Sequence, residues 1–241
     1  MDSMYTHISQ QYNAELEDIR SKVLQMGGLV EQQIDQALQA LVKGDVALGE
    51  AVIMDDTKVN SMEVAIDEEC SQIIARRQPA ASDLRLVVAV IKTITDLERI
   101  GDEAEKIARM AVRLAGDERP KNNYSEIHSL GMHVRTMVHN ALDAFARVDI
   151  EAAFNVARED RKVDEQYEAV IRQLITVMME DPRTITRVLN VIWAARALER
   201  IGDHASNLCE YIVFLVKGKD VRHTSLEQVE KEILGRDVSQ A

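Results

Sequence analysis

A hexapeptide, Leu-Glu-Arg-Ile-Gly-Asp, occurs twice in the chain, at residues 97–102 and at residues 198–203. Both copies lie inside long stretches of helical hydrophobic periodicity, which indicates that a helical unit has been duplicated. In each copy a glutamate precedes an aspartate by four residues. At 3.6 residues per turn this spacing places both carboxylates on one helix face, where they can hold a cation.

The duplication extends well beyond the hexapeptide. Ten pairs of identical or similar residues, among them Gly27 with Gly131 and Asp56 with Asp160, lie 104 residues apart. The offset falls to 101 for the hexapeptides, so a three-residue difference in length lies between the second and third helical stretches. Length changes of this kind belong in loops. The sequence therefore predicts two copies of a unit of about 100 residues.

The composition favours long helices and argues against binding of nucleic acid. Of 241 residues, 46% are hydrophobic and only 4% aromatic, with three prolines and ten glycines. This suits helices packed through aliphatic side chains, so we expect an all-α protein. The formal net charge of -12 disfavours broad contact with nucleic-acid phosphates, which depends on lysine and arginine.

Several features indicate a cytoplasmic protein without a membrane span. Cys70 and Cys209 are isolated in apolar surroundings and are expected to be reduced, buried thiols. Residues 1–20 contain several acids and no apolar block, so we expect no secretory signal. The longest apolar runs, at 86–91 and 211–216, fall far short of the ~20 residues that a membrane-spanning helix needs.

Breaks in the periodicity divide each copy into three helices. The expected ranges are about 10–43, 46–76 and 83–115 in the first copy, and about 125–147, 150–179 and 183–217 in the second. The connections are short, so neighbouring helices should run antiparallel. The prediction is two tandem three-helix bundles, with six long helices related by a pseudo-twofold axis.

Glycines and a polar stretch mark the domain limits. Gly116 and Gly218 are expected to end the third helix of each copy. We therefore predict a first bundle over 1–119, a second over 120–218 and a polar tail over 219–241. The capping pattern from Thr224 to Glu227 predicts one short helix in this tail, which is otherwise expected to be mobile.

Acidic residues on the second helix of each copy match the hexapeptide acids of the third. In the first copy Asp56 and Asn60, followed by Glu63, lie as far before the interhelical loop as Glu98 and Asp102 lie after it. In the second copy Asp160 and Asp164 are related to Glu199 and Asp203 in the same way. In antiparallel helices such residues lie side by side. Oxygen ligands from two helices suit hard or borderline cations, so one metal site is predicted in each bundle.

A simpler interpretation competes with metal binding, and the glycines beside the acids have a simple explanation that is compatible with it. The acids could be solvated charges, with Glu98 or Asp102 paired to Arg99, Lys106 or another arginine, in a metal-free scaffold. The mid-helix glycines of the hexapeptides cost about 1 kcal/mol relative to alanine, and tight helix packing beside the acids is the favoured reason for them.

The common catalytic motifs are missing, which favours a binding module. No histidine follows a glutamate by three residues, as in di-iron bundles, and there is no phosphate-binding glycine loop, nucleophile elbow or Cys-x-x-Cys pair. His204 could supply a nitrogen ligand in the second copy, although a histidine without metal is favoured. Trp193 and the methionines are assigned to the core. The alternative is a metal-dependent enzyme or oxidase that uses the carboxylate pairs.

Several motifs together resemble the PhoU family of phosphate-specific transport accessory proteins, over residues 7–218. They are His7-Ile8-Ser9, Glu15-Leu16, Met26-Gly27 with Val30-Glu31, Asp56-x-x-Val59-Asn60 with Glu63, Gln78-Pro79 with Asp83-Leu84-Arg85, and both copies of Glu-Arg-Ile-Gly-Asp. The resemblance implies two three-helix bundles related by a pseudo-twofold axis. It also implies multinuclear metal clusters on the acid-x-x-x-acid motifs, and often a homodimer.

By the same resemblance, the protein is a cytoplasmic regulator without catalytic activity. It would contact the ATPase of the phosphate ABC transporter and the phosphate-sensing histidine kinase, and repress the phosphate-starvation response when phosphate is plentiful. Membrane association would occur only through these partners. Asn60 stands where the family usually has aspartate, and Tyr167 takes the place that Glu63 has in the first copy. The two clusters are therefore expected to differ, and iron, zinc, manganese and magnesium are all candidate ions.

Overall fold

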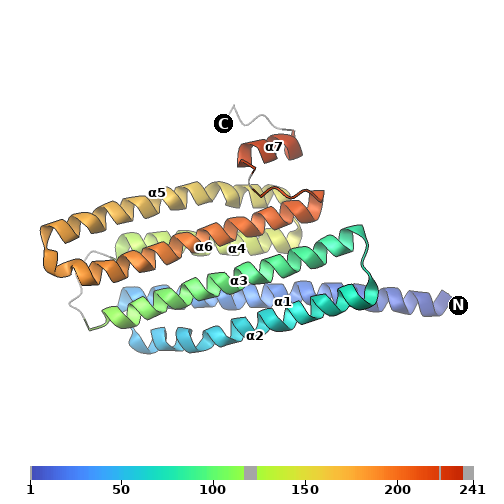
Figure 1. Cartoon of the computed structure of the whole chain (residues 1–241), viewed down its shortest axis with the longest axis horizontal. Helices are drawn as coiled ribbons and strands as arrows, with labels where there is room; N and C mark the ends of the chain where they lie inside the picture. Colours follow the sequence, from blue (N-terminus) through green and yellow to red (C-terminus); the bar gives the residue numbers. More distant parts are fainter. Residues whose placement is uncertain (1, 117–123, 223, 236–241) are drawn as a thin grey trace.

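The computed structural model describes residues 2–116, 124–222 and 224–235 (Figure 1). These ranges form seven α-helices and no strand, which confirms the predicted all-α class. The helices are α1 Asp2–Lys43, α2 Val46–Arg77, α3 Ala81–Leu114, α4 Ser125–Arg147, α5 Ile150–Glu180, α6 Ile185–Lys217 and α7 Leu226–Leu234. The first six correspond to the six helices expected from the periodicity.

The breaks between helices use the same capping chemistry in both repeats. Asp45 accepts a hydrogen bond from the backbone nitrogen of Leu48 at the start of α2, and Asp149 accepts one from Ala152 at the start of α5. These carboxylates satisfy backbone donors that the first helical turn leaves unpaired. The duplication thus preserves the cap as well as the helices.

Some helix ends differ from the prediction. Asp181 caps a single 3₁₀ turn, Pro182–Thr184, and α6 begins after it at Ile185. Gly218 ends α6 in the left-handed conformation, at φ 69°, as expected of a C-terminal glycine. Gly116 follows the C-cap residue of α3, Ala115, but does not adopt the left-handed conformation. The predicted boundary between residues 119 and 120 lies outside the described residues.

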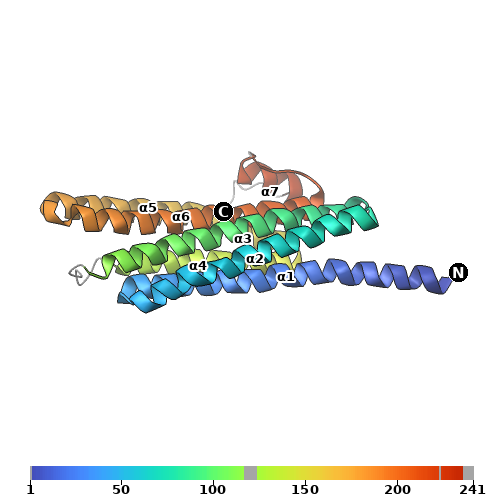
Figure 2. The ribbon, with the colours of Figure 1, turned by 60° about the horizontal axis from the view of Figure 1, so that its bottom comes forward.

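The six long helices form two layers. Figures 1 and 2 show α5, α6, α3 and α2 side by side in this order, with α4 and α1 behind them. Each repeat is a three-helix bundle, and the two bundles pack side by side through α3 and α6, with a further contact between α1 and α4. The two hexapeptides therefore lie on the pair of helices that joins the repeats.

One continuous hydrophobic core spans both repeats. The hexapeptide residues Leu97, Ile100, Leu198 and Ile201 all belong to it and have no exposed surface. Burial of each such side chain contributes about 1.5–3 kcal/mol relative to exposure. The hexapeptide thus has two faces, an apolar face in the core and an acidic face toward α2 or α5.

The expected short helix of the tail is present as α7. Its cap is Ser225 rather than Thr224, because the Ser225 side chain accepts the hydrogen bond from the backbone nitrogen of Gln228. Val229 of α7 packs in a small apolar cluster with Phe154 of α5, Val213 of α6 and Val221. The described part of the tail is therefore attached to the second repeat, and residues 236–241 lie outside the described residues.

Trp193 lies on the surface, so its assignment to the core was wrong. Its side chain is 64% exposed, and Met54 and Met179, also assigned to the core, are 74% and 79% exposed, whereas Cys70 and Cys209 are buried as predicted. Trp193 continues a four-residue spacing from Ile185 and Leu189, and this apolar stripe is exposed as well. A helix with two apolar stripes does not reveal from its periodicity which stripe is buried. No described helix is both long and apolar enough to cross a membrane.

Candidate metal site

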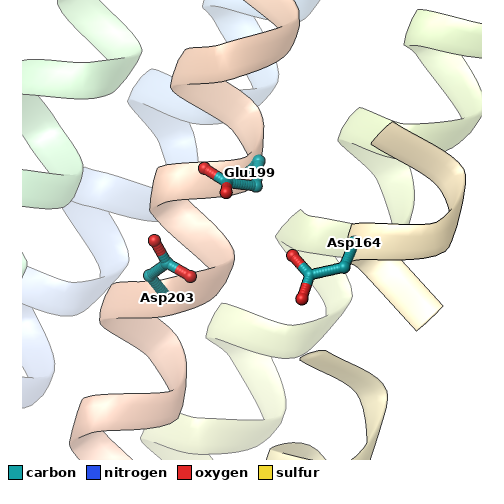
Figure 3. A group of neighbouring side chains, drawn as sticks. All are labelled: Asp164, Glu199 and Asp203. Carbon is teal, nitrogen blue, oxygen red and sulfur yellow. The ribbon is translucent and has the colours of Figure 1, made fainter. Parts of the chain in front are cut away.

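The second acidic cluster consists of Asp160 and Asp164 of α5 with Glu199 and Asp203 of α6. Asp164, Glu199 and Asp203 each offer a carboxylate oxygen, and these oxygens all lie within 4.8 Å of one another (Figure 3). Within the described part of the chain, this is the only such group of three acids or other potential ligands. Ligands from two helices at this separation can bind one ion jointly.

The carboxylates of the second cluster destabilise one another's charged forms. Burial, together with the charges of Asp203 and Asp164, raises the pKa of Asp160 to about 6. Burial and Asp203 also raise the pKa of Glu199, and burial and Asp164 raise the pKa of Asp203. A cation among these groups would reverse the repulsion.

Unpaired oxygens in the second cluster also indicate that it can bind a cation. One oxygen of Asp160 and one of Glu199 are buried without a hydrogen-bond partner among the described residues. Buried acceptors normally have partners, since an unsatisfied polar group costs about 1–3 kcal/mol. The donor set therefore fits a metal ion with oxygen ligands.

The first acidic cluster consists of Asp56, Asn60, Glu63, Glu98 and Asp102. Burial and the charge of Asp102 raise the pKa of Asp56, while burial, Asp102 and Glu63 raise that of Glu98. The structure thus brings the predicted residues of α2 and α3 into one electrostatic group. This adjacency is the arrangement that hairpin counting predicted from the sequence.

Two amide groups donate hydrogen bonds to a carboxylate of the first cluster. The Asn60 amide donates a hydrogen bond of 3.1 Å to Asp56, and the buried Gln33 amide of α1 donates another of 3.4 Å. In the second repeat Asp164 occupies the position of Asn60 and adds a negative charge instead. Each cluster nevertheless has four carboxylates, because Tyr167 stands in the second repeat where Glu63 stands in the first.

The repeats differ at a second pair of positions, which face each other across the two helices. In the first repeat burial raises the pKa of Glu63, and a hydrogen bond from Thr95 offsets part of this rise. In the second repeat the matching residues are Tyr167 and Arg196, and the guanidinium lies 5.8 Å from the centre of the tyrosine ring. Arg196 also forms a 2.5 Å ion pair with Glu199. The two clusters consequently differ in composition, as the sequence predicted.

The mid-helix glycines make room for the cluster acids. A Cβ built on Gly101 would lie 3.3 Å from an Asp56 oxygen, and one built on Gly202 would lie 3.6 Å from an Asp160 oxygen. Both glycines therefore allow α2 or α5 to approach its partner helix beside the carboxylates. This is the close packing that the sequence suggested for them.

The cations nearest the hexapeptide acids are engaged with other partners. Arg99 lies 3.6 Å from Asp96, and Lys106 lies 3.0 Å from Glu103. Both of these acids are buried on α3, where an unpaired charge would be costly. Among the described cluster residues, the interpretation as a surface ion pair therefore applies to Glu199 alone, through its pair with Arg196.

His204 points away from the second cluster. Its Nδ1 lies 2.7 Å from a carboxylate oxygen of Asp96, across the junction between α6 and α3. Tyr211 donates a 2.5 Å hydrogen bond to the other oxygen of Asp96, which is 1% exposed. Sequence reasoning missed Asp96. The available signal was its position between Thr93 and Ile100 in the stripe of α3 that faces α6.

Comparison with known proteins identifies close relatives over nearly the whole chain. The family model of the PhoU domain matches residues 23–111 and 127–212, one match in each repeat. The chain is 53% identical over 232 residues to the phosphate-specific transport system accessory protein PhoU homolog of Pseudomonas aeruginosa, covering 96% of both chains. It is 52% identical over 239 residues to the accessory protein PhoU of Escherichia coli, covering 98% of this chain and 99% of that one.

Two crystal structures share the fold. PhoU from Pseudomonas aeruginosa superposes with a TM-score of 0.84 at 53% identity, covering 86% of this chain and 100% of that chain. The phosphate transport system regulatory protein PhoU from Streptococcus pneumoniae gives a TM-score of 0.81 at 29% identity, with coverage of 87% and 99%.

Proposed function

The chain belongs to the PhoU family, and on this basis we propose that it is an accessory protein of a phosphate transport system with a regulatory, non-catalytic role. The observation that carries the proposal is the 52% identity to an accessory protein of such a system over 98% of the chain. This identity extends over nearly the full length of both chains. The regulated process is the uptake of phosphate and the signalling of its supply.

The partners proposed are the ATPase of the phosphate ABC transporter and the phosphate-sensing histidine kinase. Bound to both, the protein would act as an adaptor that represses the phosphate-starvation response when phosphate is plentiful. Both partners present surfaces in the cytoplasm, which is the proposed location of this chain. A homodimer is the proposed assembly, because an adaptor with two copies can engage two partners at once.

Metal ions are proposed to bind the two acidic clusters and to brace each helix pair. In the second cluster Asp160, Asp164, Glu199 and Asp203 would be the ligands, and an ion there would tie α5 to α6. In the first cluster the proposed ligands are Asp56, Asn60, Glu63, Glu98 and Asp102. Iron, zinc, manganese and magnesium all accept such oxygen donors, and a carboxylate can bridge two ions.

A binding experiment with purified partners tests the adaptor role. The ATPase and the cytoplasmic part of the kinase are immobilised separately, and binding of the full chain is measured at high and low phosphate. The proposal expects specific binding to both proteins. Binding to neither under any phosphate concentration would refute it. Oxygen consumption during an anaerobic-to-aerobic iron titration would instead favour the rival oxidase function.

A further inference from the structure

Five large apolar side chains are exposed near the hairpin between α5 and α6. Their exposed fractions are 44% for Ile175, 79% for Met179, 42% for Ile185, 45% for Leu189 and 64% for Trp193. We call this set the apolar ladder. Large apolar side chains gathered on one surface mark interaction sites far more often than isolated ones do.

The antiparallel register of the two helices brings the apolar ladder together. Tyr167 meets Arg196 across the helices, and Asp164 meets Glu199 one turn farther from the hairpin. Continued toward the hairpin, the same register places Ile175 level with Leu189 and Met179 level with Ile185. The steps of four residues keep each row on one helix face.

The apolar ladder continues directly from the second acidic cluster. Along α6, Trp193 is followed at steps of three by Arg196 and Glu199, so all three share one face. The ladder and the cluster thus occupy successive parts of one surface between α5 and α6. Figures 1 and 2 both show the hairpin end of this pair projecting beyond the neighbouring ends of α3 and α4, where a partner can reach it.

The first repeat has only part of the apolar ladder. Leu84 and Val88 match Ile185 and Leu189, and Leu84 is 40% exposed, but Ser71, Ala75 and Lys92 stand at the positions of Ile175, Met179 and Trp193. The two most exposed members, Met179 and Trp193, are therefore specific to the second repeat. Exposed Trp and Met side chains lower solubility, so a function of this surface explains their presence better than packing does.

The apolar ladder lies in a region with an excess of positive charge, in an otherwise acidic chain. Residues 172–196 contain four arginines and two acids, Glu180 and Asp181, whereas the whole chain has a net charge of -12. On the flanks, the side chains of Arg172 and Arg183 are 69% and 90% exposed, and each pairs with an acid close in sequence. Exposed pairs of this kind contribute little, so these guanidinium groups can exchange their partners at low cost.

We propose that the apolar ladder is the docking surface for an amphipathic helix of a partner protein, with acidic residues along the margins of its apolar face. Two antiparallel helices with apolar residues at four-residue spacing form a groove that accepts a third helix. Trp193 is the anchor, since a large exposed aromatic side chain gains most from burial at an interface. The arginines select acidic margins by charge complementarity.

The identity of the partner rests on the proposed function, which names the transporter ATPase and the kinase. Their binding is measured for the parent, for the double variant Leu189→Glu/Trp193→Glu and for Met54→Glu. Met54 is 74% exposed on α2 and is the matched control. The expected result is at least a tenfold loss of affinity for the double variant toward one partner, and less than a twofold change for the control. Equal binding by parent and double variant overturns the docking assignment.

A second measurement keeps the two proposals separable, because Trp193 is the only tryptophan of the chain. Its fluorescence is followed while an 18-residue amphipathic helical peptide with Leu on one face and Glu on the margins is added. The same peptide with Lys margins serves as the charge control. A blue shift with at least tenfold tighter binding of the Glu peptide supports the docking surface, even where the ATPase and kinase do not bind.

Three results of this titration overturn the proposal. The first is no shift with the Glu peptide, and the second is equal binding of both peptides. The third is a blue shift with phosphatidylglycerol vesicles alone, which assigns the apolar ladder to a membrane surface. Sedimentation of the parent and the double variant can give a fourth result that overturns the proposal. If the double variant no longer self-associates and the parent does not bind the peptide, the apolar ladder is a contact between copies of the chain.

Discussion

Gly27 of α1 makes room for Leu142 of α4, since a Cβ built on Gly27 would lie 2.6 Å from a methyl carbon of Leu142. The duplicated pair does the same in reverse, because a Cβ on Gly131 would lie 2.3 Å from a methyl carbon of Leu38. Each repeat thus offers a glycine to a leucine of the other. The pseudo-twofold symmetry is therefore seen in the contacts between the bundles as well as in the path of the backbone.

The adjacent Gly27 and Gly28 provide a test of these reciprocal glycine–leucine contacts, which we call the interlock. Gly27→Ala should destabilise the protein by about 1–3 kcal/mol, because the added methyl overpacks a filled core position. Gly28→Ala should instead stabilise it by up to about 1 kcal/mol, since nothing lies within 4 Å of its added Cβ and alanine is the better helix former. Chemical denaturation measures both. Equal effects of the two substitutions would contradict the interlock.

Asp96 should be a strong determinant of stability at the junction of the repeats. Asp96→Ala removes a buried carboxylate and leaves His204 and Tyr211 without their shared acceptor, so we expect a loss of about 3–5 kcal/mol in thermal or chemical unfolding. Asp67→Ala, at an exposed position of α2, should change stability by less than about 0.5 kcal/mol. A loss below 1 kcal/mol for Asp96→Ala would show that the network is not structural.

The same carboxylate predicts a pH dependence. Burial would raise the pKa of Asp96, but hydrogen bonds from His204 and Tyr211 outweigh burial and hold it below the ordinary value of 3.8. A lowered pKa in the folded state stabilises the protein above the ordinary value, and this contribution is lost as the pH falls through the folded-state pKa. Asp96→Asn should therefore flatten the acid limb of a plot of stability against pH below about 4.

The sequence predicted the six long helices because the repeat, the helix breaks and the hydrophobic period agree. Asp45 and Asp149 lie at two of the predicted breaks, and the structure shows that both cap the helix that follows. The relative placement of the two bundles was not predictable in this way. It depends on which apolar stripes of α3 and α6 meet, and these helices are apolar on more than one side.

The same distinction explains the outcome at the candidate site. The adjacency of Asp56 to the acids of α3 follows from counting residues along a hairpin, so it was accessible from the sequence. The contact of His204 with Asp96 joins the two repeats and depends on the packing between them. Trp193 was misplaced for a related reason, because the sequence shows an apolar stripe but not whether another helix covers it.

Helix α7 should be released by a single polar substitution. Val229 is 4% exposed in the cluster with Phe154 and Val213, so Val229→Asp places a charge against an apolar surface. Limited proteolysis should then cleave the tail at least tenfold faster, while the six long helices keep their unfolding temperature. Gln228→Asp introduces the same side chain at a neighbouring exposed position and should cleave as the parent does. Equal cleavage of both variants would show that α7 is not held by this cluster.

Asp160 links the second cluster to the stability of the whole protein. Its pKa rises from 3.8 to about 6 on folding, through burial and the charges of Asp203 and Asp164. A raised folded-state pKa contributes stability that is complete below the unfolded value and lost as the pH rises toward 6. Without metal, ionised Asp160 therefore opposes folding at pH 7, and Asp160→Asn should stabilise the metal-free protein by about 1–3 kcal/mol.

A bound cation should reverse this effect, because it stabilises the ionised carboxylates that otherwise repel one another. Manganese added to the parent at pH 7 should raise the unfolding temperature, and the gain should shrink at pH 5, where protons compete for Asp160. In Asp160→Asn the gain should fall and its pH dependence should weaken, while Asp160→Glu should retain part of both. Thermal unfolding of the three proteins with and without manganese measures this. An equal manganese effect in all three at both pH values would exclude Asp160 as a ligand and leave its raised pKa as a consequence of burial and of the neighbouring charges alone.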